Sequence, residues 1–183
     1  MRVITGLARN ARLKAPEGLS TRPTSDMAKE AIFSILQFEL EQAMVLDLFA
    51  GSGQLGIEAL SRGAKFAVFV DTERQAQECI RQNLAVTRLA QQARVAAMPA
   101  ESYLASCKER FDIALLDPPY QSGLLQTVLP QVAARMQPEG VIVCESERDE
   151  QLPECAGDFV LYKTYRYGRV KVTTYRKQQE EVE

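Results

Sequence analysis

The stretch Val45-Leu46-Asp47-Leu48-Phe49-Ala50-Gly51-Ser52-Gly53-Gln54-Leu55-Gly56 carries the pattern on which the fold prediction depends. The apolar run over 44–48 is typical of a buried strand, and residues 54–62 have the apolar spacing of a helix. Between them, glycines at 51, 53 and 56 have the spacing G-x-G-x-x-G. A tight turn would explain one of these glycines but not all three. The spacing therefore favours a loop whose backbone is closely approached by a ligand.

Strand and helix patterns alternate on both sides of this loop. Further strands are predicted at 66–70, 94–97, 111–116 and 141–145, and further helices at 72–89, 100–106 and 124–135. Thr24, Ser25 and Asp26 are candidate N-caps for an earlier helix, and Thr72 with Gln75 matches a capping box. Residues 159–166 and 169–175 alternate around Tyr167-Gly168, which predicts a β-hairpin.

This order of elements predicts an α/β protein. We expect a mostly parallel seven-stranded sheet with helices on both faces and a C-terminal antiparallel hairpin. Residues 1–20 form a small N-terminal β-hairpin extension in this prediction, 21–177 the main domain, and 178–183 a frayed tail.

Composition excludes several classes of chemistry. The 183 residues include no histidine, so a Ser-His-Asp or Cys-His nucleophile and any histidine-ligated metal are impossible. The four cysteines match no C-x-x-C spacing, and Cys79 and Cys144 lie among apolar neighbours, which predicts buried reduced thiols and no metal. No apolar run approaches a membrane span, and the N-terminus lacks a signal-peptide pattern, so we expect a cytoplasmic protein.

The net charge of −2 conceals an asymmetry along the chain. Residues 1–29 carry +4 and residues 161–177 carry +6, whereas 30–160 carry −9 and 178–183 carry −3. An acidic body with two basic ends suggests an anionic polymer as partner, although solvated strand faces would give the same distribution.

Two aspartates bear on the ligand of the glycine loop. Asp71 follows Gly51 by twenty residues, which satisfies the dinucleotide fingerprint and predicts a carboxylate for the ribose of an adenosine-like ligand. Asp47 precedes the loop and would repel a pyrophosphate, whereas it would favour the ammonium and sulfonium of S-adenosylmethionine. Alternatively, Asp47 only accepts amide hydrogens of the loop, which would suit either ligand.

The second motif is Asp117-Pro118-Pro119-Tyr120, directly after the predicted strand 111–116. The prolines remove two backbone donors and stiffen the chain, which leaves the Asp117 carboxylate and the Pro118 carbonyl as acceptors. Tyr120 adds a flat ring. Acceptors beside a stacking ring suit an exocyclic amino group on a planar base, although a rigid surface turn is the alternative.

Together these residues resemble a known family. D-x-F-x-G-x-G followed by D-P-P-Y is similar to the Rossmann-like S-adenosylmethionine-dependent methyltransferases that modify exocyclic amines. Arg22-Pro23-Thr24-Ser25-Asp26 with Lys29-Glu30 and Phe33, Val143-Cys144-Glu145, and 163–168 resemble bacterial 16S rRNA guanine-N2 methyltransferases of the RsmD type. The chain departs from the pattern of this family at two places. The first is the turn Arg9-Asn10-Ala11-Arg12, where the family has more glycine. The second is the apolar segment 97–100, where the family is polar, so we expect a backbone amide near Ala100 or Glu101 to contact adenine.

The resemblance implies methyl transfer from S-adenosylmethionine to the N2 amine of a guanine in 16S rRNA, in the small subunit or its assembly intermediate. The expected catalytic residues are Asp117, Pro118 and Tyr120. The expected cofactor-binding residues are Asp47, Phe49, Gly51, Ser52, Gly53, Asp71 and Ala100. The expected RNA-binding residues are Arg9, Arg12, Arg22, Arg166 and Arg169. We expect a monomer.

Three other functions stay open at this point. Adenine-N6 methylation of DNA or RNA is the alternative within the same chemistry, because it also uses an acidic D-P-P-Y. An NAD-linked dehydrogenase meets the glycine rule, although no hydride-transfer constellation is evident in the chain. A non-enzymatic RNA-binding protein on the same fold is the third.

Overall fold

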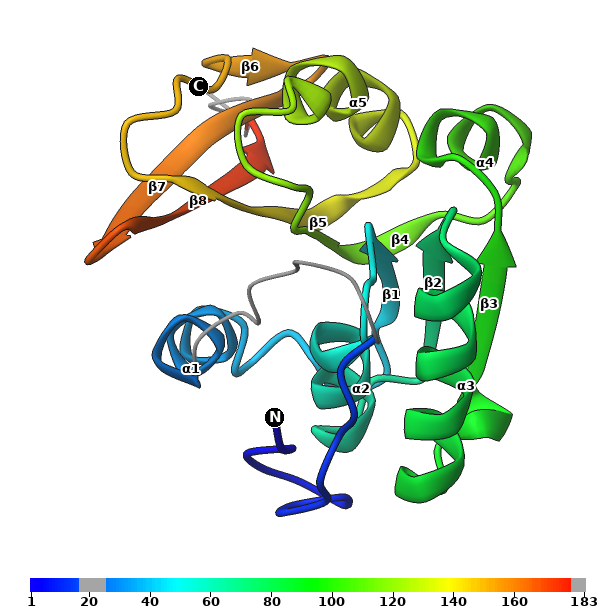
Figure 1. The fold of residues 1–183 in the computed structure, drawn as a ribbon. Coiled ribbons are helices and arrows are strands. Elements are labelled where there is room, and N and C mark those ends of the chain that lie inside the picture. Colours follow the sequence, from blue (N-terminus) through cyan, green and yellow to red (C-terminus); the bar gives the residue numbers. More distant parts are fainter. Residues whose placement is uncertain (17–25, 179–183) are drawn as a thin grey trace.

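A computed structural model describes residues 1–16 and 26–178. The sheet has eight strands in the order β3-β2-β1-β4-β5-β8-β7-β6 (Figure 1). The strands are β1 (Met44–Leu48), β2 (Phe66–Asp71), β3 (Ala93–Ala97), β4 (Phe111–Leu116), β5 (Met136–Glu147), β6 (Cys155–Ala156), β7 (Phe159–Tyr167) and β8 (Val170–Lys177). The first five run parallel, and β8, β7 and β6 are antiparallel. The predicted mostly parallel sheet is confirmed, and the strand beyond the predicted seven is the two-residue β6.

Helices cover both faces of the sheet, as the apolar strands require. They are α1 (Asp26–Ile35), α2 (Gln54–Ser61), α3 (Arg74–Thr87), α4 (Ala100–Ser106) and α5 (Leu124–Ala133), with a short 3₁₀ turn at Ala90–Gln92. On one face α1, α2 and α3 build a core with Val45, and on the other α4 and α5 build a core with Leu46. No helix of the described residues is long and apolar enough to cross a membrane.

The loops after the parallel strands meet at one edge of the sheet. Leu48 is level with Val70 on one side and with Leu116 on the other, and Leu116 is level with Cys144. The residues that directly follow Leu48, Val70, Leu116 and Cys144 therefore lie side by side along this edge. The chain leaves β3 at one edge and enters β4 beside β1, so β1 and β4 flank the point where strand order reverses, which is where such sheets bind ligands.

Two local predictions need correction. Helix α3 begins at Arg74 with Glu73 as N-cap and no side-chain cap, so the capping box at Thr72 is wrong. The C-terminal hairpin turns at Gly168-Arg169, because Tyr167 pairs with Val170. The N-terminal arm turns back on itself: Arg2 and Arg12 form an antiparallel bridge, the Val3 amide donates to the Ala11 carbonyl at 3.0 Å, and the Leu13 amide donates to the Met1 carbonyl at 3.0 Å. The predicted N-caps Thr24 and Ser25 and the tail from 179 lie outside the described residues.

Candidate active site

A cavity of about 800 Å³ lies at the carboxyl ends of the parallel strands, a size typical of small-molecule sites. Its wall includes all three predicted catalytic residues and, of the predicted cofactor residues, every one except Gly53: Asp47, Phe49, Gly51, Ser52, Asp71, Ala100, Asp117, Pro118 and Tyr120. The structure thus brings the glycine loop and the D-P-P-Y motif to one cavity, although they are more than sixty residues apart in sequence.

The glycine loop turns sharply between β1 and α2. Phe49, Gly51 and Gly53 have φ values of 66°, 56° and 77°, in the left-handed region. A side chain there is strained in any residue but glycine, and such strain at Phe49 is typical of functional sites. A Cβ at Gly51 would meet nothing within 4 Å, so its backbone faces open space. A Cβ at Gly56 would lie 2.3 Å from Phe69 Cε1, which explains why the helix needs glycine there.

Asp47 is buried beneath this loop. Its Oδ2 accepts a hydrogen bond of 2.8 Å from the Gly56 amide, so it takes the loop-supporting role that the sequence left as an alternative. Burial raises the pKa of Asp47 well above its ordinary value, which the Gly56 bond opposes, and repulsion from Asp117 and Asp71 raises it further. Because Asp47 also lines the cavity, the loop rests on a carboxylate that a nearby cation would stabilise in its ionised form.

Asp71 holds the loop from the adjacent strand. Its Oδ2 accepts the Gly51 amide at 2.8 Å, and its Oδ1 accepts the Glu73 amide at 2.9 Å. The second bond satisfies one of the amides at the start of α3, so the Thr72 hydroxyl is not needed there. A carboxylate has about four acceptor positions, which leaves Asp71 the capacity to accept ligand hydroxyls as well.

The D-P-P-Y segment forms the part of the cavity wall that follows β4, the strand next to β1. Asp117 follows Leu116 and is therefore level with Glu145 of β5. The Tyr120 hydroxyl donates a hydrogen bond of 3.0 Å to Glu145 Oε1, and Glu145 is 4% exposed. This bond fixes one end of the Tyr120 ring over the cavity. The sequence left the role of Glu145 undecided, and the structure places it in the cavity wall, where it accepts the hydrogen bond of the Tyr120 hydroxyl.

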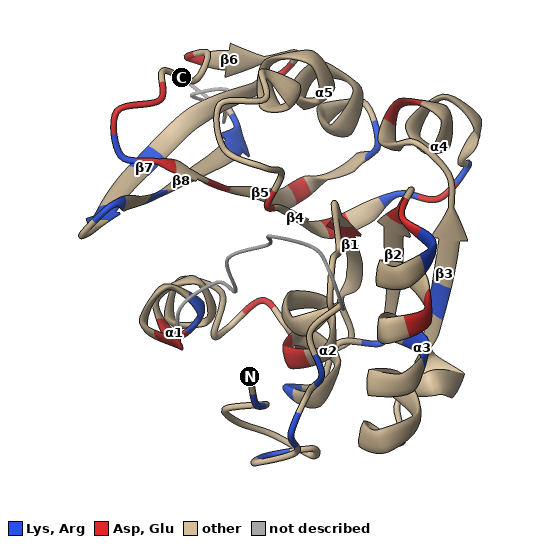
Figure 2. Ribbon diagram, in the orientation of Figure 1, with Lys and Arg blue, Asp and Glu red and all other residues tan. Residues whose placement is uncertain are grey.

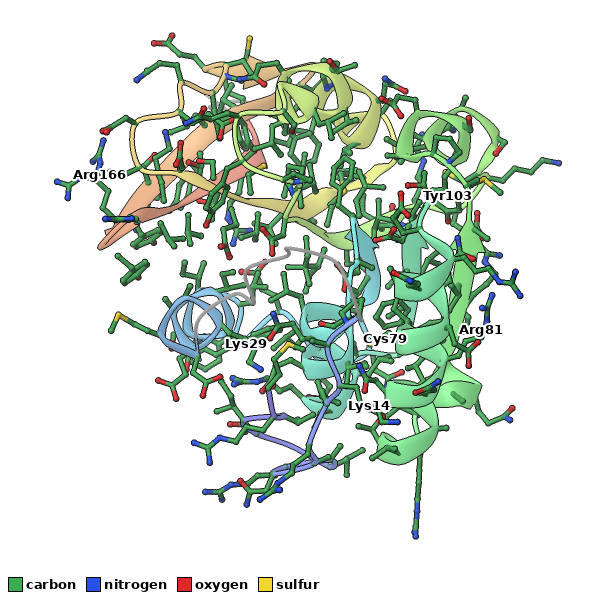
Figure 3. The ribbon with its side chains drawn as sticks, in the orientation of Figure 1. Lys14, Lys29, Cys79, Arg81, Tyr103 and Arg166 are labelled. Carbon is green, nitrogen blue, oxygen red and sulfur yellow. The ribbon has the colours of Figure 1, made fainter. Side chains whose placement is uncertain are left out.

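The N-terminal arm, residues 1–16, contributes a wall that the sequence did not predict. Met1, Ala15 and Pro16 line the cavity. Buried Asn83 of α3 holds the arm: its Oδ1 accepts the Lys14 amide at 2.8 Å, and its Nδ2 donates to the carbonyls of Lys14 at 3.0 Å and Ser52 at 2.9 Å. Figure 3 shows Lys14 beside α3 near Cys79. One side chain therefore joins the arm to the glycine loop.

Four of the predicted RNA-binding arginines lie in the described residues, and none of these four lines the cavity. Arg9 and Arg12 are exposed in the N-terminal arm, and Arg166 and Arg169 are exposed at the tip of the β7–β8 hairpin, where Arg166 points outward (Figure 3). Figure 2 shows basic residues at these two places and acidic residues where β1, β4 and β5 meet. The predicted contrast of an acidic centre with basic ends is present in space. Arg22 lies outside the described residues.

Further wall residues were missed or left open by the sequence prediction. They are Ala50, Gln54, Leu55, Val70, Thr72, Glu73, Met98, Pro99, Glu101, Pro119, Leu124 and Glu145. Most lie at or just after the carboxyl end of a predicted strand or at the start of the helix that follows it, and this position was the signal that could have identified them. The four cysteines carry no disulfide, and Cys79 and Cys144 are buried as predicted. Among the described residues, no group of three or more histidine, cysteine or acidic side chains is placed to hold a metal ion.

Comparison with known proteins gives consistent relatives. A protein of Bacillus subtilis named as a candidate rRNA methyltransferase, YlbH, is 40% identical over 182 residues, which cover 97% of this chain and 99% of the relative. Ribosomal RNA small subunit methyltransferase D of Escherichia coli is 33% identical over 180 residues, covering 97% and 90%. A solved structure described as a candidate methyltransferase, YhhF from Escherichia coli, matches with a TM-score of 0.87 and 34% identity, covering 98% and 99%.

The family model described as conserved hypothetical protein 95 matches residues 1–176. The match spans the arm, the glycine loop, the D-P-P-Y wall and the hairpin. The chain therefore belongs to the conserved hypothetical protein 95 family, the RsmD family that its motifs resemble.

Proposed function

We propose that this protein is an S-adenosylmethionine-dependent methyltransferase that acts on the exocyclic N2 amine of a guanine in 16S rRNA. The observation that carries the proposal is the single cavity in which the glycine loop faces Asp117, Pro118 and Tyr120. Relatives named as rRNA methyltransferases, matched over nearly the whole chain, support the same class of substrate.

The cavity suits S-adenosylmethionine by two observations. Its wall carries the carboxyl groups of Asp47, Asp71, Asp117 and Glu145, a set that favours a cationic ligand and disfavours a pyrophosphate. The Gly51 backbone faces open space that a Cβ would enter, so a ligand can approach it. In the proposal, Asp71 accepts the ribose hydroxyls, Phe49 and Ser52 flank the ligand, and the backbone near Ala100 contacts adenine.

The D-P-P-Y segment provides hydrogen-bond acceptors for the target base. S-adenosylmethionine, when bound, supplies an electrophilic methyl group on sulfur. The guanine N2 lone pair is delocalised into the ring, so the amine is a poor nucleophile. Asp117 and the Pro118 carbonyl accept hydrogen bonds from the N–H groups of this amine. These hydrogen bonds favour a pyramidal nitrogen and stabilise the positive charge that develops on it during methyl transfer. Tyr120 stacks on a base that has left its helix.

A transfer assay tests the function. Purified protein with methyl-labelled S-adenosylmethionine should label free 16S rRNA, assembly intermediates or small subunits, and a nucleoside digest should show N2-methylguanosine. N6-methyladenosine in the digest of an RNA or DNA substrate would replace the proposal with the adenine alternative. No transfer to any of these substrates would contradict it.

Replacing Tyr120 separates stacking from anchoring. Tyr120→Ala should lower kcat/KM for RNA roughly 10- to 100-fold, because a stacked base is worth about 1–3 kcal/mol. Tyr120→Phe keeps the ring and removes the hydroxyl that donates to Glu145, so it should lower kcat/KM only a few-fold. Steady-state rates at saturating cofactor measure both. Equal losses in the two variants would mean that the hydroxyl, rather than the ring, is the functional part.

Charge removal at the hairpin tip tests the RNA grip. The double variant Arg166→Ala/Arg169→Ala should weaken RNA binding and lower the slope of log affinity against log salt by about one to two units, since each phosphate contact contributes nearly one unit. Affinity for S-adenosylhomocysteine should not change, because both arginines lie away from the cavity. The exposed pair Arg81→Ala/Arg88→Ala on the α3 side is the matched control. An unchanged salt slope in the hairpin variant would rule the tip out as an RNA contact.

A further inference from the structure

Asn83 of α3 lies where the N-terminal arm meets the glycine loop, and it is not itself part of the cavity wall. Its side chain is 1% exposed, and its amide makes three of its possible four hydrogen bonds to main-chain groups of Lys14 and Ser52. Burial of an amide costs free energy unless such bonds replace its hydration. Asn83 is therefore suited to one position only, the place where these two segments come together.

The part of the arm that Asn83 binds leads directly into the cavity wall. Lys14 is followed by Ala15 and Pro16, and both of these line the cavity. Asn83 accepts the Lys14 amide at 2.8 Å and donates to the Lys14 carbonyl at 3.0 Å, so one side chain fixes this residue through both of its main-chain groups. Cys79, one turn earlier on α3, also donates to the Lys14 carbonyl at 3.2 Å. The position of this wall therefore depends on α3.

The other residue that Asn83 binds lies at a flexible point of the glycine loop. Ser52 stands between Gly51 and Gly53, whose φ values of 56° and 77° are left-handed. Glycine loses more backbone freedom than any other residue when it is ordered. Asp71 fixes the loop at the Gly51 amide, and Asn83 fixes it at a second point, the Ser52 carbonyl, at 2.9 Å. A loop that is ordered in advance costs less free energy when a ligand binds to it.

We propose that Asn83 is a positioning residue of the cofactor site. It holds the arm and the glycine loop in the positions from which both line the cavity, so that the cofactor does not have to order them when it binds. Asn83 contacts no ligand and acts through Ser52 and the segment 14–16. The proposal rests on the proposed function for the identity of the cofactor.

Two replacements of Asn83 test this role. Asn83→Ala removes all three hydrogen bonds, whereas Asn83→Asp keeps the size and the acceptor for the Lys14 amide but loses both donated bonds. Each variant should weaken binding of S-adenosylhomocysteine roughly tenfold, the effect of having to order about one residue of backbone on binding. The loss should come mainly from faster dissociation. Calorimetry and surface plasmon resonance measure the two quantities.

Steady-state kinetics separate this role from a role in the chemical step. The KM for S-adenosylmethionine should rise by a similar factor in both variants, because the cofactor must then order its own site. At saturating cofactor the site is ordered again, so kcat should stay within about threefold of wild type. A loss confined to kcat would contradict the proposal.

Thr87→Val is the matched control on the same helix. Thr87 lies one turn after Asn83 and is 8% exposed, and its hydroxyl donates to the main-chain carbonyls of Asn83 at 2.8 Å and Leu84 at 3.2 Å. The variant keeps the size of the side chain and loses a buried hydrogen bond that joins neither the arm nor the loop. It should lower the midpoint of urea unfolding without changing the affinity for S-adenosylhomocysteine.

The comparison of stability with affinity decides the proposal. If Asn83 only stabilised the fold, its variants would lower the urea midpoint and bind S-adenosylhomocysteine as wild type does, which would overturn the proposal. An equal loss of affinity in Thr87→Val would overturn it as well, because the effect would then come from a weakened α3. Failure of the wild-type protein to bind S-adenosylhomocysteine would instead overturn the proposed cofactor, and the role of Asn83 with it.

Discussion

Asp117→Ala is expected to lower kcat for methyl transfer by roughly 10²- to 10³-fold while changing the affinity for S-adenosylhomocysteine less than threefold. Removal of one group that stabilises developing charge in a water-excluded site typically has an effect of this size. Asp117 lies in the cavity wall directly after β4, beside the glycine loop, and in our proposal it contacts the target amine rather than the cofactor. Single-turnover rates with labelled cofactor, together with calorimetry, measure the two quantities separately.

Two further variants make this result specific. Asp117→Asn keeps an acceptor oxygen but not the charge, so its rate should lie between those of wild type and Asp117→Ala. Asp158→Ala removes an exposed aspartate near the C-terminal hairpin, whose ion-pair partner Lys177 is also solvent-exposed, and should leave the rate unchanged. If Asp117→Ala instead lost cofactor binding and retained its rate at saturating cofactor, then Asp117 would belong to the cofactor site and its proposed role would be wrong.

The position of the site followed from the sequence because parallel strands end at one edge of a sheet. The apolar runs at 44–48 and 111–116 sufficed to place Asp117 and the glycine loop at the same edge of the sheet, but only the structure shows that their strands are neighbours. The hydrogen bond from Tyr120 to Glu145 did not follow, because it depends on the register of β5, which periodicity does not determine. Asn83 looked like an ordinary polar helix residue, and only the path of the arm shows that it joins Lys14 to Ser52.

The errors in the fold prediction have local physical causes. Thr72 and Gln75 have capping-box spacing, but Asp71 already accepts the Glu73 amide, so the helix starts later than the pattern suggested. Strand β6 has two residues, too few for alternation to be recognised. Gly56 was identified as part of a ligand motif, whereas the structure shows that its lack of a side chain serves the contact between α2 and Phe69.

Glu58→Ala is expected to destabilise the protein by about 3–5 kcal/mol, the usual cost of breaking a buried ion pair. Glu58 is fully buried in α2, where its oxygens accept the amides of Ile4 at 2.8 Å and Thr5 at 3.0 Å and Arg62 Nε at 2.8 Å. Lys29 Nζ, also fully buried, is 3.9 Å from Glu58 Oε2. The variant would leave a buried ammonium without its carboxylate and release the N-terminal arm. Urea unfolding measures the change.

The pH dependence distinguishes the lost ion pair from a general packing defect. Burial lowers the pKa of Lys29, and the charge of Glu58 opposes that shift. Without Glu58 the pKa of Lys29 in the folded state falls further. Between that lowered pKa and the ordinary value of 10.5, the unfolded state binds more protons than the folded state, so the free energy of unfolding rises with pH. The deficit of Glu58→Ala should therefore narrow as the pH is raised towards 10.5. Glu109→Ala, which breaks the exposed pair with Arg94, should cost at most about 1 kcal/mol. A deficit that stays constant with pH would mean that Lys29 is not the group left unpaired.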